Sequence, residues 1–429
     1  MSFLQEAWAS VLTEGHKLHE ELLNLREMLD KDFENLMARP HLVRPLFTML
    51  RNHKPILIAP KIAVVSLYAD VVEVLNNEAA FSSVPIYAPK MEATTGDFVL
   101  GMDATPQYAQ EIGLMRQAAH PEDLERIRGF VNTQAAELVA AAGGHLDLVA
   151  GLSRVVPTRL VGDYFGTPGP DEATTMVWMR AIFRQIFLNL GNDPNMAKEA
   201  GASAVALNAY LDNLIAQRKA ELAAGQELPD DFLCRLLKMQ QTDPFADEVV
   251  RRILGGTIVG TVDTNSKAIA QLIDQLLDRP LTLAEAQEAA RADNDELVTR
   301  YIFEALRFSP QNPILLRRCE QATTIAEGTD RVAVIPQGSL VVVGTESAMF
   351  DPAKFPEPDA FRIDRPQEDY IHFGSGMHTC FGKHIASILI PMVAKQLLKR
   401  QNLRRAEGPE GTLRFDGAFP DHLLVSYDA

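Results

Sequence analysis

A single cysteine in a glycine-rich turn is the part of this sequence best suited to chemistry. Cys380 ends the run His372-Phe373-Gly374-Ser375-Gly376-Met377-His378-Thr379 and comes shortly before a long apolar segment of helical character. The amino end of a helix offers hydrogen-bond donors and a positive potential, which favour a thiolate. Gly374 and Gly376 permit positive φ and leave the backbone bare, so a flat ligand could lie against the turn. The alternative is an inert cysteine buried in a turn.

The spacing Phe-x-x-Gly-x-His-x-Cys-x-Gly, from Phe373 to Gly382, resembles the haem-thiolate loop of the cytochrome P450 family. In that family the cysteine is the axial ligand of the haem iron, and its thiolate favours O–O cleavage. The resemblance implies haem b (iron protoporphyrin IX) as cofactor and Cys380 as the metal ligand. It also implies that Phe373, Gly374 and Gly382 lie against the cofactor.

Composition narrows the class of protein. The chain has 429 residues, 47% of them hydrophobic, which is enough for one large core. Its cysteines, Cys234, Cys319 and Cys380, are widely spaced, so we expect neither a disulfide framework nor a zinc site, and we expect a reducing, cytoplasmic location. The formal net charge of −16 argues against nucleic acid and anionic membranes as partners. No apolar stretch reaches membrane-spanning length.

The pattern along the chain predicts a mainly α fold with small β-sheets. Short strands are expected at 55–59 and 61–67, helices over about 106–306, further strands at 332–335 and 340–343 joined by a turn at 336–338, and short β segments over 413–427. We expect a single domain over 1–429, with an N-terminal helical segment over about 1–54. The resemblance covers about 55–429 and implies the cytochrome P450 fold, with the haem between two central helices.

Glu304 and Arg307 stand at i and i+3 in a helical segment, where their charges can pair. Alone, such a pair is usually an exposed salt bridge of little consequence. Its place before the cysteine run resembles the family's Glu-x-x-Arg pair, which joins a later arginine in a buried network. Ala360 stands at that later position here, so Arg362 or Arg365 is expected to substitute. We assign this network to the scaffold.

Haem propionates need cationic or hydrogen-bonding partners, and arginine suits them because its fork is bidentate and always charged. By resemblance, His378 and Arg317 are expected to contact them, with Arg318 as a rival one residue along. The family's third donor follows a histidine that is missing here. Tyr108 and Arg116 are the stand-ins, of which Arg116 is the expected donor.

Asp263 and Thr264 follow an apolar, glycine-containing helical stretch and resemble the family's Ala-Gly-x-(Asp/Glu)-Thr segment. The resemblance assigns Thr264 a hydrogen bond to the bound oxygen and Asp263 the supply of protons for O₂ cleavage. The alternatives are a threonine bonded to its own helix and a capped or solvated carboxylate. Thr261 replaces the family's glycine, which adds bulk and a hydroxyl.

These features together predict a monooxygenase that inserts one atom of O₂ into a hydrophobic small molecule. The sequence has no flavin, nicotinamide or iron–sulfur motif, so electrons must come from an external donor of the ferredoxin or flavodoxin type. A basic patch near Lys383 is expected to meet that donor. The alternatives are a peroxide-driven peroxygenase or fatty-acid hydroperoxide isomerase, and a non-catalytic haem-binding protein.

Overall fold

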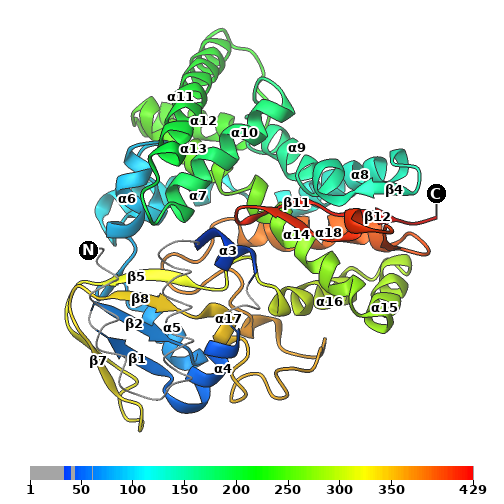
Figure 1. Cartoon of the computed structure of the whole chain (residues 1–429). Coiled ribbons are helices and arrows are strands. Elements are labelled where there is room, and N and C mark those ends of the chain that lie inside the picture. Colours follow the sequence, from blue (N-terminus) through cyan, green and yellow to red (C-terminus); the bar gives the residue numbers. More distant parts are fainter. Residues whose placement is uncertain (1–32, 40–43, 60, 429) are drawn as a thin grey trace.

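Helices form most of the chain, and a small sheet stands to one side of them (Figure 1). The structure is a computed structural model that describes residues 33–39, 44–59 and 61–428. Its helices are α3 (Phe33–Ala38), α4 (Arg44–His53), α5 (Tyr68–Asn76), α6 (Val84–Glu92), α7 (Pro106–Ala118), α8 (Asp123–Ala141), α9 (Val155–Asp163), α10 (Glu172–Phe183), α11 (Pro194–Ala223), α12 (Phe232–Thr242), α13 (Asp247–Val259), α14 (Val262–Leu277), α15 (Pro280–Arg291), α16 (Asp295–Phe308), α17 (Thr345–Ala348) and α18 (Lys383–Leu398).

Short 3-10 or π-helical turns interrupt this pattern at η3 (Val99–Gly101), η4 (Val149–Ser153), η5 (Arg184–Leu188), η6 (Gln367–Asp369) and η7 (Pro409–Gly411). The helical segment predicted over about 1–54 lies largely outside the described residues, and α3 and α4 are its described part. Among the described residues, every helix is too short or too polar to cross a bilayer.

The largest sheet has five strands in the order β1 (Ile56–Ala59), β2 (Ile62–Val65), β8 (Leu340–Val343), β5 (Leu315–Cys319) and β3 (Phe81–Ser82). Smaller sheets pair β6 (Thr323–Ile325) with β7 (Ala333–Ile335), β10 (Arg414–Asp416) with β11 (Phe419–His422), and β4 (His145–Asp147) with β12 (Leu424–Ser426), which also pairs with β9 (Arg404–Arg405). The mainly α class with small sheets is confirmed.

The turn predicted to join 332–335 to 340–343 does not make a hairpin. β7 pairs antiparallel with β6, whereas β8 lies between β2, its parallel partner, and β5, its antiparallel partner. The fully buried Val341, Val342 and Val343 explain the choice, because a strand apolar on both faces belongs in the interior of a sheet.

α14 and α18 pack against each other through the middle of the molecule (Figure 1). α18 is lined by buried side chains on nearly every side, including Leu389, Val393 and Leu397, and α16 and α8 cover it further. The loop that carries Cys380 precedes α18 directly, so the best-buried helix of the core fixes one end of that loop.

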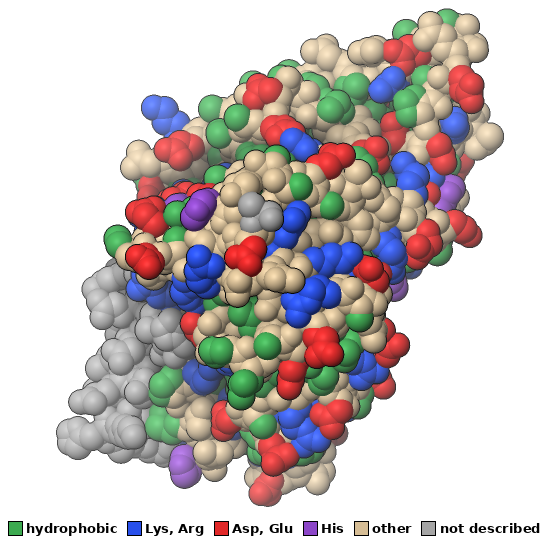
Figure 2. Space-filling view, turned by 90° about the vertical axis from the view of Figure 1, so that its right-hand side faces the viewer, with side chains coloured by type: hydrophobic (Ala, Val, Ile, Leu, Met, Phe, Trp, Pro, Cys, Tyr) green, Lys and Arg blue, Asp and Glu red, His purple; other side chains and the backbone are tan. Residues whose placement is uncertain are grey.

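Charged side chains cover the outside of this core. Figure 2 shows acidic and basic side chains interspersed over the face that carries the C terminus. Opposite charges pair at the surface of the chain, as Lys399 does with Asp293 at 2.6 Å and Arg405 with Asp278 at 2.7 Å. The net negative charge of the chain therefore does not make this face uniformly acidic.

Candidate active site

The cysteine loop, residues 371–382, is shaped by two glycines and closed by its own backbone. Gly374 and Gly376 have φ of 74° and 77°, values that side chains disfavour. A Cβ on Gly376 would also collide with the carbonyl of Leu75 in α5, so the loop rests on α5 at this point. The Cys380 amide donates to the Phe373 carbonyl at 2.9 Å, which turns the loop back on itself before α18 begins.

The Cys380 side chain is exposed, whereas Cys234 and Cys319 are buried. The surrounding protein nevertheless raises the pKa of the Cys380 thiol, and the Gly382 amide and Lys383 act against that rise. A thiol whose pKa is raised by the surrounding protein stays protonated unless a positive partner binds it. The setting therefore suits a thiolate ligand to a metal ion.

Arg317 and His378 lie on one side of this loop. Arg317 is 3% exposed, its described hydrogen bond goes to the Leu316 carbonyl at 2.9 Å, and its Nε has no partner among the described residues. Burial lowers the pKa of His378 to about 4, helped by Arg317, and its Nε2 lies 3.2 Å from the Ser83 hydroxyl. No carboxylate of the described residues lies within ion-pair distance of Arg317, and a buried guanidinium without such a partner is costly, so this corner can accommodate an anionic group such as a haem propionate.

The two stand-in residues of α7 lie in different settings. The Tyr108 hydroxyl donates to the Met377 carbonyl at 3.0 Å, and its ring meets the edge of His378 at 6.2 Å. Tyr108 thus contacts the cysteine loop directly. Arg116 is exposed in the last turn of α7, and Arg318, the rival of Arg317, is also exposed.

The sequence did not indicate Glu78, which shares this corner. Its Oε2 lies 3.5 Å from His378 Nε2, and neither carboxylate oxygen has a hydrogen-bond partner among the described residues. Burial raises the pKa of Glu78, against the effect of the nearby Arg317. A buried acid here shares the field of Arg317 with whatever anion binds.

The predicted charge network is present and fully buried. Arg307 donates to both oxygens of Glu304 at 2.8 and 2.9 Å, and both side chains are 0% exposed. Arg365 is the arginine that joins them, with its Nε 3.5 Å from Glu304, whereas the Arg362 side chain turns outward to Asp364. Arg362 contributes its backbone amide to Glu304 at 2.9 Å instead.

Tyr370 ties this network to the cysteine loop, a role that the sequence did not reveal. Its hydroxyl donates to Glu304 at 2.7 Å, and its ring stacks on His372 at 5.3 Å. Burial lowers the pKa of His372 to about 4, so its neutral ring can donate from Nε2 to the Phe303 carbonyl at 3.0 Å. The start of the loop is thereby fastened to α16.

The helical stretch before Asp263 is not one continuous helix. α13 ends at Val259, Gly260 and Thr261 form a break, and α14 begins at Val262. Hydroxyls take up the carbonyls around the break: Thr261 donates to Thr257 at 2.9 Å and Thr264 to Gly260 at 2.5 Å. Thr264 therefore adopts the back-bonded arrangement that the sequence left open.

Asp263 is buried and held by arginines from two other elements. Arg180 of α10 donates to its Oδ1 at 2.8 Å, and Arg154, beside α9, lies 3.2 Å from the same oxygen. Its Oδ2 has no partner among the described residues. The solvated carboxylate considered from the sequence is wrong, because Asp263 is 1% exposed.

Aromatic side chains from three separate segments contact one another, and one of them, Phe419, lies under Arg180, the partner of Asp263. Phe183 lies 5.4 Å from Phe419 and 4.5 Å from Phe187, and Phe187 lies 5.4 Å from Tyr87. Phe98 lies so close to Gly256 of α13 that any Cβ there would clash with its ring. These contacts form an aromatic cluster around α10 and β11, and Phe98 packs closely on α13.

A cysteine just before the amino end of α18 and a buried arginine that makes no ion pair with a described residue are compatible with a haem-thiolate site. The sequence model of the Cytochrome P450 family matches residues 56–414. The chain therefore belongs to the cytochrome P450 family, and it is a haem-binding oxidoreductase of the monooxygenase type.

Individual relatives agree with this assignment. Mycinamicin IV hydroxylase/epoxidase of Micromonospora griseorubida is 26% identical over 321 residues, which are 74% of this chain and 75% of that protein. Psi-producing oxygenase A of Emericella nidulans is 25% identical over 74% of this chain but only 32% of its own length. The crystal structure of CalO2 has the same fold, with a TM-score of 0.78 at 22% identity over 92% of this chain and 97% of that chain.

The buried network predicts a graded loss of stability. Glu304→Gln leaves Arg307 and Arg365 without their counter-charge, so we expect the free energy of unfolding to fall by about 3–5 kcal/mol. Tyr370→Phe removes one hydrogen bond to a charged group and should cost about 1.5–3 kcal/mol. Arg362→Met, whose side chain pairs only at the surface, should change stability by about 0.5 kcal/mol or less. Denaturant titration measures all three, and an equal effect of Arg362→Met would contradict the buried network.

Proposed function

We propose that Cys380 would ligate the iron of a haem b, and that Arg317, His378 and the exposed Arg116 would hold its propionates. The observation that supports this proposal is the buried Arg317, which makes no ion pair with any described residue and lies near His378 of the loop that carries the exposed Cys380. Phe373, Gly374 and Gly382 would lie against the cofactor. Haem b, rather than a covalently attached haem, is supported because the sequence has no Cys-x-x-Cys-His motif.

When bound, the haem supplies an iron that reduces O₂, so that one oxygen atom enters the substrate and the other leaves as water. The chain's part is to bring protons and exclude bulk water. Asp263 suits the first task because its Oδ2 is buried and has no partner among the described residues, while Arg154 and Arg180 hold its Oδ1. Thr264, the next residue, adds a hydroxyl that donates to the Gly260 carbonyl. The apolar lining around Phe183 and Phe419 suits the second.

Asp263→Asn removes the carboxylate that we assign to proton delivery. We expect reductase-driven turnover to fall about 10²-fold or more and to show a larger solvent isotope effect, while turnover driven by hydrogen peroxide, which brings its own protons, stays within about twofold. Asp416→Asn is the matched control, since Asp416 pairs with the same Arg180 at 3.6 Å but is exposed.

An equal loss of both activities in Asp263→Asn would mean that Asp263 holds the fold of the site and carries no protons. If the unaltered protein forms product from peroxide as fast as from the reductase system, a peroxygenase or hydroperoxide isomerase becomes the better description.

The family implies electrons from a separate redox partner, and we propose a ferredoxin or flavodoxin in a reducing, cytoplasmic setting. The three free cysteines support that setting. Lys383, exposed in the first turn of α18 and three residues after Cys380, is the proposed contact for an acidic carrier.

Lys383→Gln should weaken carrier binding and slow reduction, because one attractive charge is lost at the docking face. Stopped-flow reduction at low and high salt measures this, and the variant should depend less on salt. Lys198→Gln, at an exposed position of α11, is the control. An unchanged salt dependence in Lys383→Gln would place the docking face elsewhere.

We propose a hydrophobic small molecule as substrate. The rings of Tyr87, Phe98, Phe183, Phe187 and Phe419 support this. A panel of fatty acyl, terpenoid and aromatic compounds, scored by the Soret shift on binding, identifies the class.

A further inference from the structure

The hairpin of β10 and β11 contacts the arginine that holds Asp263. Asp416 of this hairpin lies 3.6 Å from Arg180, and the Pro420 carbonyl accepts from the same guanidinium at 3.5 Å. The guanidinium also lies over the ring of Phe419, 5.2 Å from its centre. Because Arg180 donates to Asp263 at 2.8 Å, the place of the hairpin bears on the place of that carboxylate.

A histidine holds the other end of the hairpin. His422 is the last residue of β11, and its ring lies between two carboxylates from separate elements. Its Nδ1 lies 2.7 Å from Asp147 Oδ2 of β4, and its Nε2 lies 2.8 Å from Glu410 Oε2 of η7. The first contact is a hydrogen bond, and the second is an ion pair without hydrogen-bond alignment. We call these three residues the histidine clasp.

The contacts of the histidine clasp require two ring protons. A neutral imidazole has one N–H and one bare nitrogen, and a bare nitrogen at such a distance from an ionised carboxylate oxygen is repelled. Glu410 has a side chain that is 48% exposed and pairs with Arg414 at 3.4 Å, which favours its ionised form. Asp147 accepts from the Val149 amide at 3.0 Å through its other oxygen, which has the same effect. The ring of His422 therefore fits as an imidazolium.

Among the described residues, the other charged groups around β11 have partners elsewhere. α14 runs beside β11 (Figure 1), and η4 also packs on it. η4 has no titratable side chain. The charged residues of α14 are engaged as follows: Asp263 with Arg180, Asp274 with Arg405, and Lys267 with the Met37 carbonyl. Asp421, next to His422, acts on the charge of Arg154, and His145 of β4 bonds to the Ser426 hydroxyl at 3.1 Å.

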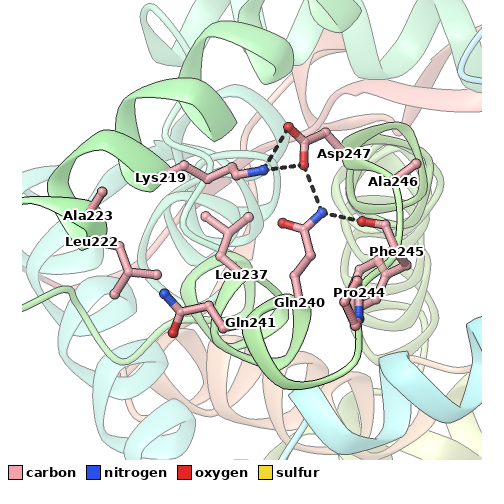
Figure 3. A pocket seen from close by; sticks show the side chains of 10 residues that line it. All are labelled: Lys219, Leu222, Ala223, Leu237, Gln240, Gln241, Pro244, Phe245, Ala246 and Asp247. Atoms are coloured by element: carbon pink, nitrogen blue, oxygen red, sulfur yellow. Dashed lines mark hydrogen bonds and ion pairs between the residues drawn. The ribbon is translucent and has the colours of Figure 1, made fainter.

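The polar cluster between α11, α12 and α13 is a useful contrast (Figure 3). It borders a cavity of about 440 Å³, and Asp247 there accepts from Lys219 at 2.7 Å and from Gln240 at 2.7 Å. Gln240 also donates to the Phe245 carbonyl. An ammonium and an amide supply these bonds, so this cluster does not depend on the protonation of a histidine.

We propose that His422 is a positioning residue whose doubly protonated ring holds β11 between Asp147 and Glu410 and thereby keeps the hairpin against Arg180. An imidazole holds its second proton at acidic pH and loses it as the pH rises. The histidine clasp should therefore be closed at pH 6 and open at pH 9. Its effect on turnover rests on the proposed function, because it reaches Asp263 through Arg180, whereas the clasp itself does not.

Hydrogen exchange measured by mass spectrometry tests the clasp on the full chain as isolated. Each rate is divided by the intrinsic rate at the same pH, which gives the protection of the amides in 414–422. This protection should fall at least threefold from pH 6 to pH 9 in the unaltered protein. His422→Arg keeps its positive charge at both pH values, so its protection should change less than 1.5-fold. His145→Gln, at a histidine without a carboxylate partner, should behave as the unaltered protein does.

Loss of the ring should reproduce the open state. His422→Gln should show at pH 6 the low protection that the unaltered protein shows at pH 9. If His422→Gln fails to fold, Glu410→Gln takes its place, and its protection should change less than twofold between the two pH values. Protection that is independent of pH in the unaltered protein, or that falls equally in His422→Arg, would overturn the clasp.

The ratio of reductase-driven to peroxide-driven turnover tests the link to Asp263. Between pH 6 and pH 9 this ratio should fall at least threefold further in the unaltered protein than in His422→Arg. An equal fall in both proteins would overturn the positioning role. Failure of the proposed function would show separately, as an equal loss of both activities in Asp263→Asn, and would leave the hydrogen-exchange result standing.

Discussion

The buried carboxylate of Glu304 is the point on which the position of Cys380 depends. It accepts two hydrogen bonds from Arg307, one from Tyr370 and one from the Arg362 amide, and Arg365 lies 3.5 Å away. These groups come from α16, from the turns after residue 349 and from the start of the cysteine loop. A buried ion pair is weak as a source of stability but strict about geometry, because each member is costly to leave unpaired. The network thus holds the loop in one place, and α18 holds its other end.

Local spacing made much of this site predictable. The Cys380 loop and the Glu304–Arg307 pair are patterns of adjacent residues, and a helix face or a glycine turn follows from them directly. Partners from distant segments were not predictable in this way. Arg154 and Arg180 reach Asp263, and Tyr370 reaches Glu304, only because the fold brings their segments together. The same limit explains the strands around 336–338, which are close in sequence but pair in different sheets.

The two sides of the proposed haem differ in how they are built. On the cysteine side the backbone is fixed by glycines and a buried network, and the thiol is open. On the α13–α14 side the helix breaks at Gly260 and Thr261, hydroxyls bond back to the helix, and Asp263 is held by two arginines. α14 continues beyond this break to the buried Lys267. Lys267 Nζ donates to the Met37 carbonyl at 2.6 Å, so the same helix also contacts α3.

The central claim is that Cys380 ligates haem iron as a thiolate. The most direct measurement is the carbon-monoxide difference spectrum of the reduced protein, recorded for the unaltered chain, for Cys380→Ser and for Cys319→Ser. Cys319 is buried in β5. The account predicts the thiolate-type band in the unaltered chain and in Cys319→Ser, and its loss in Cys380→Ser. Persistence of that band in Cys380→Ser would contradict the account.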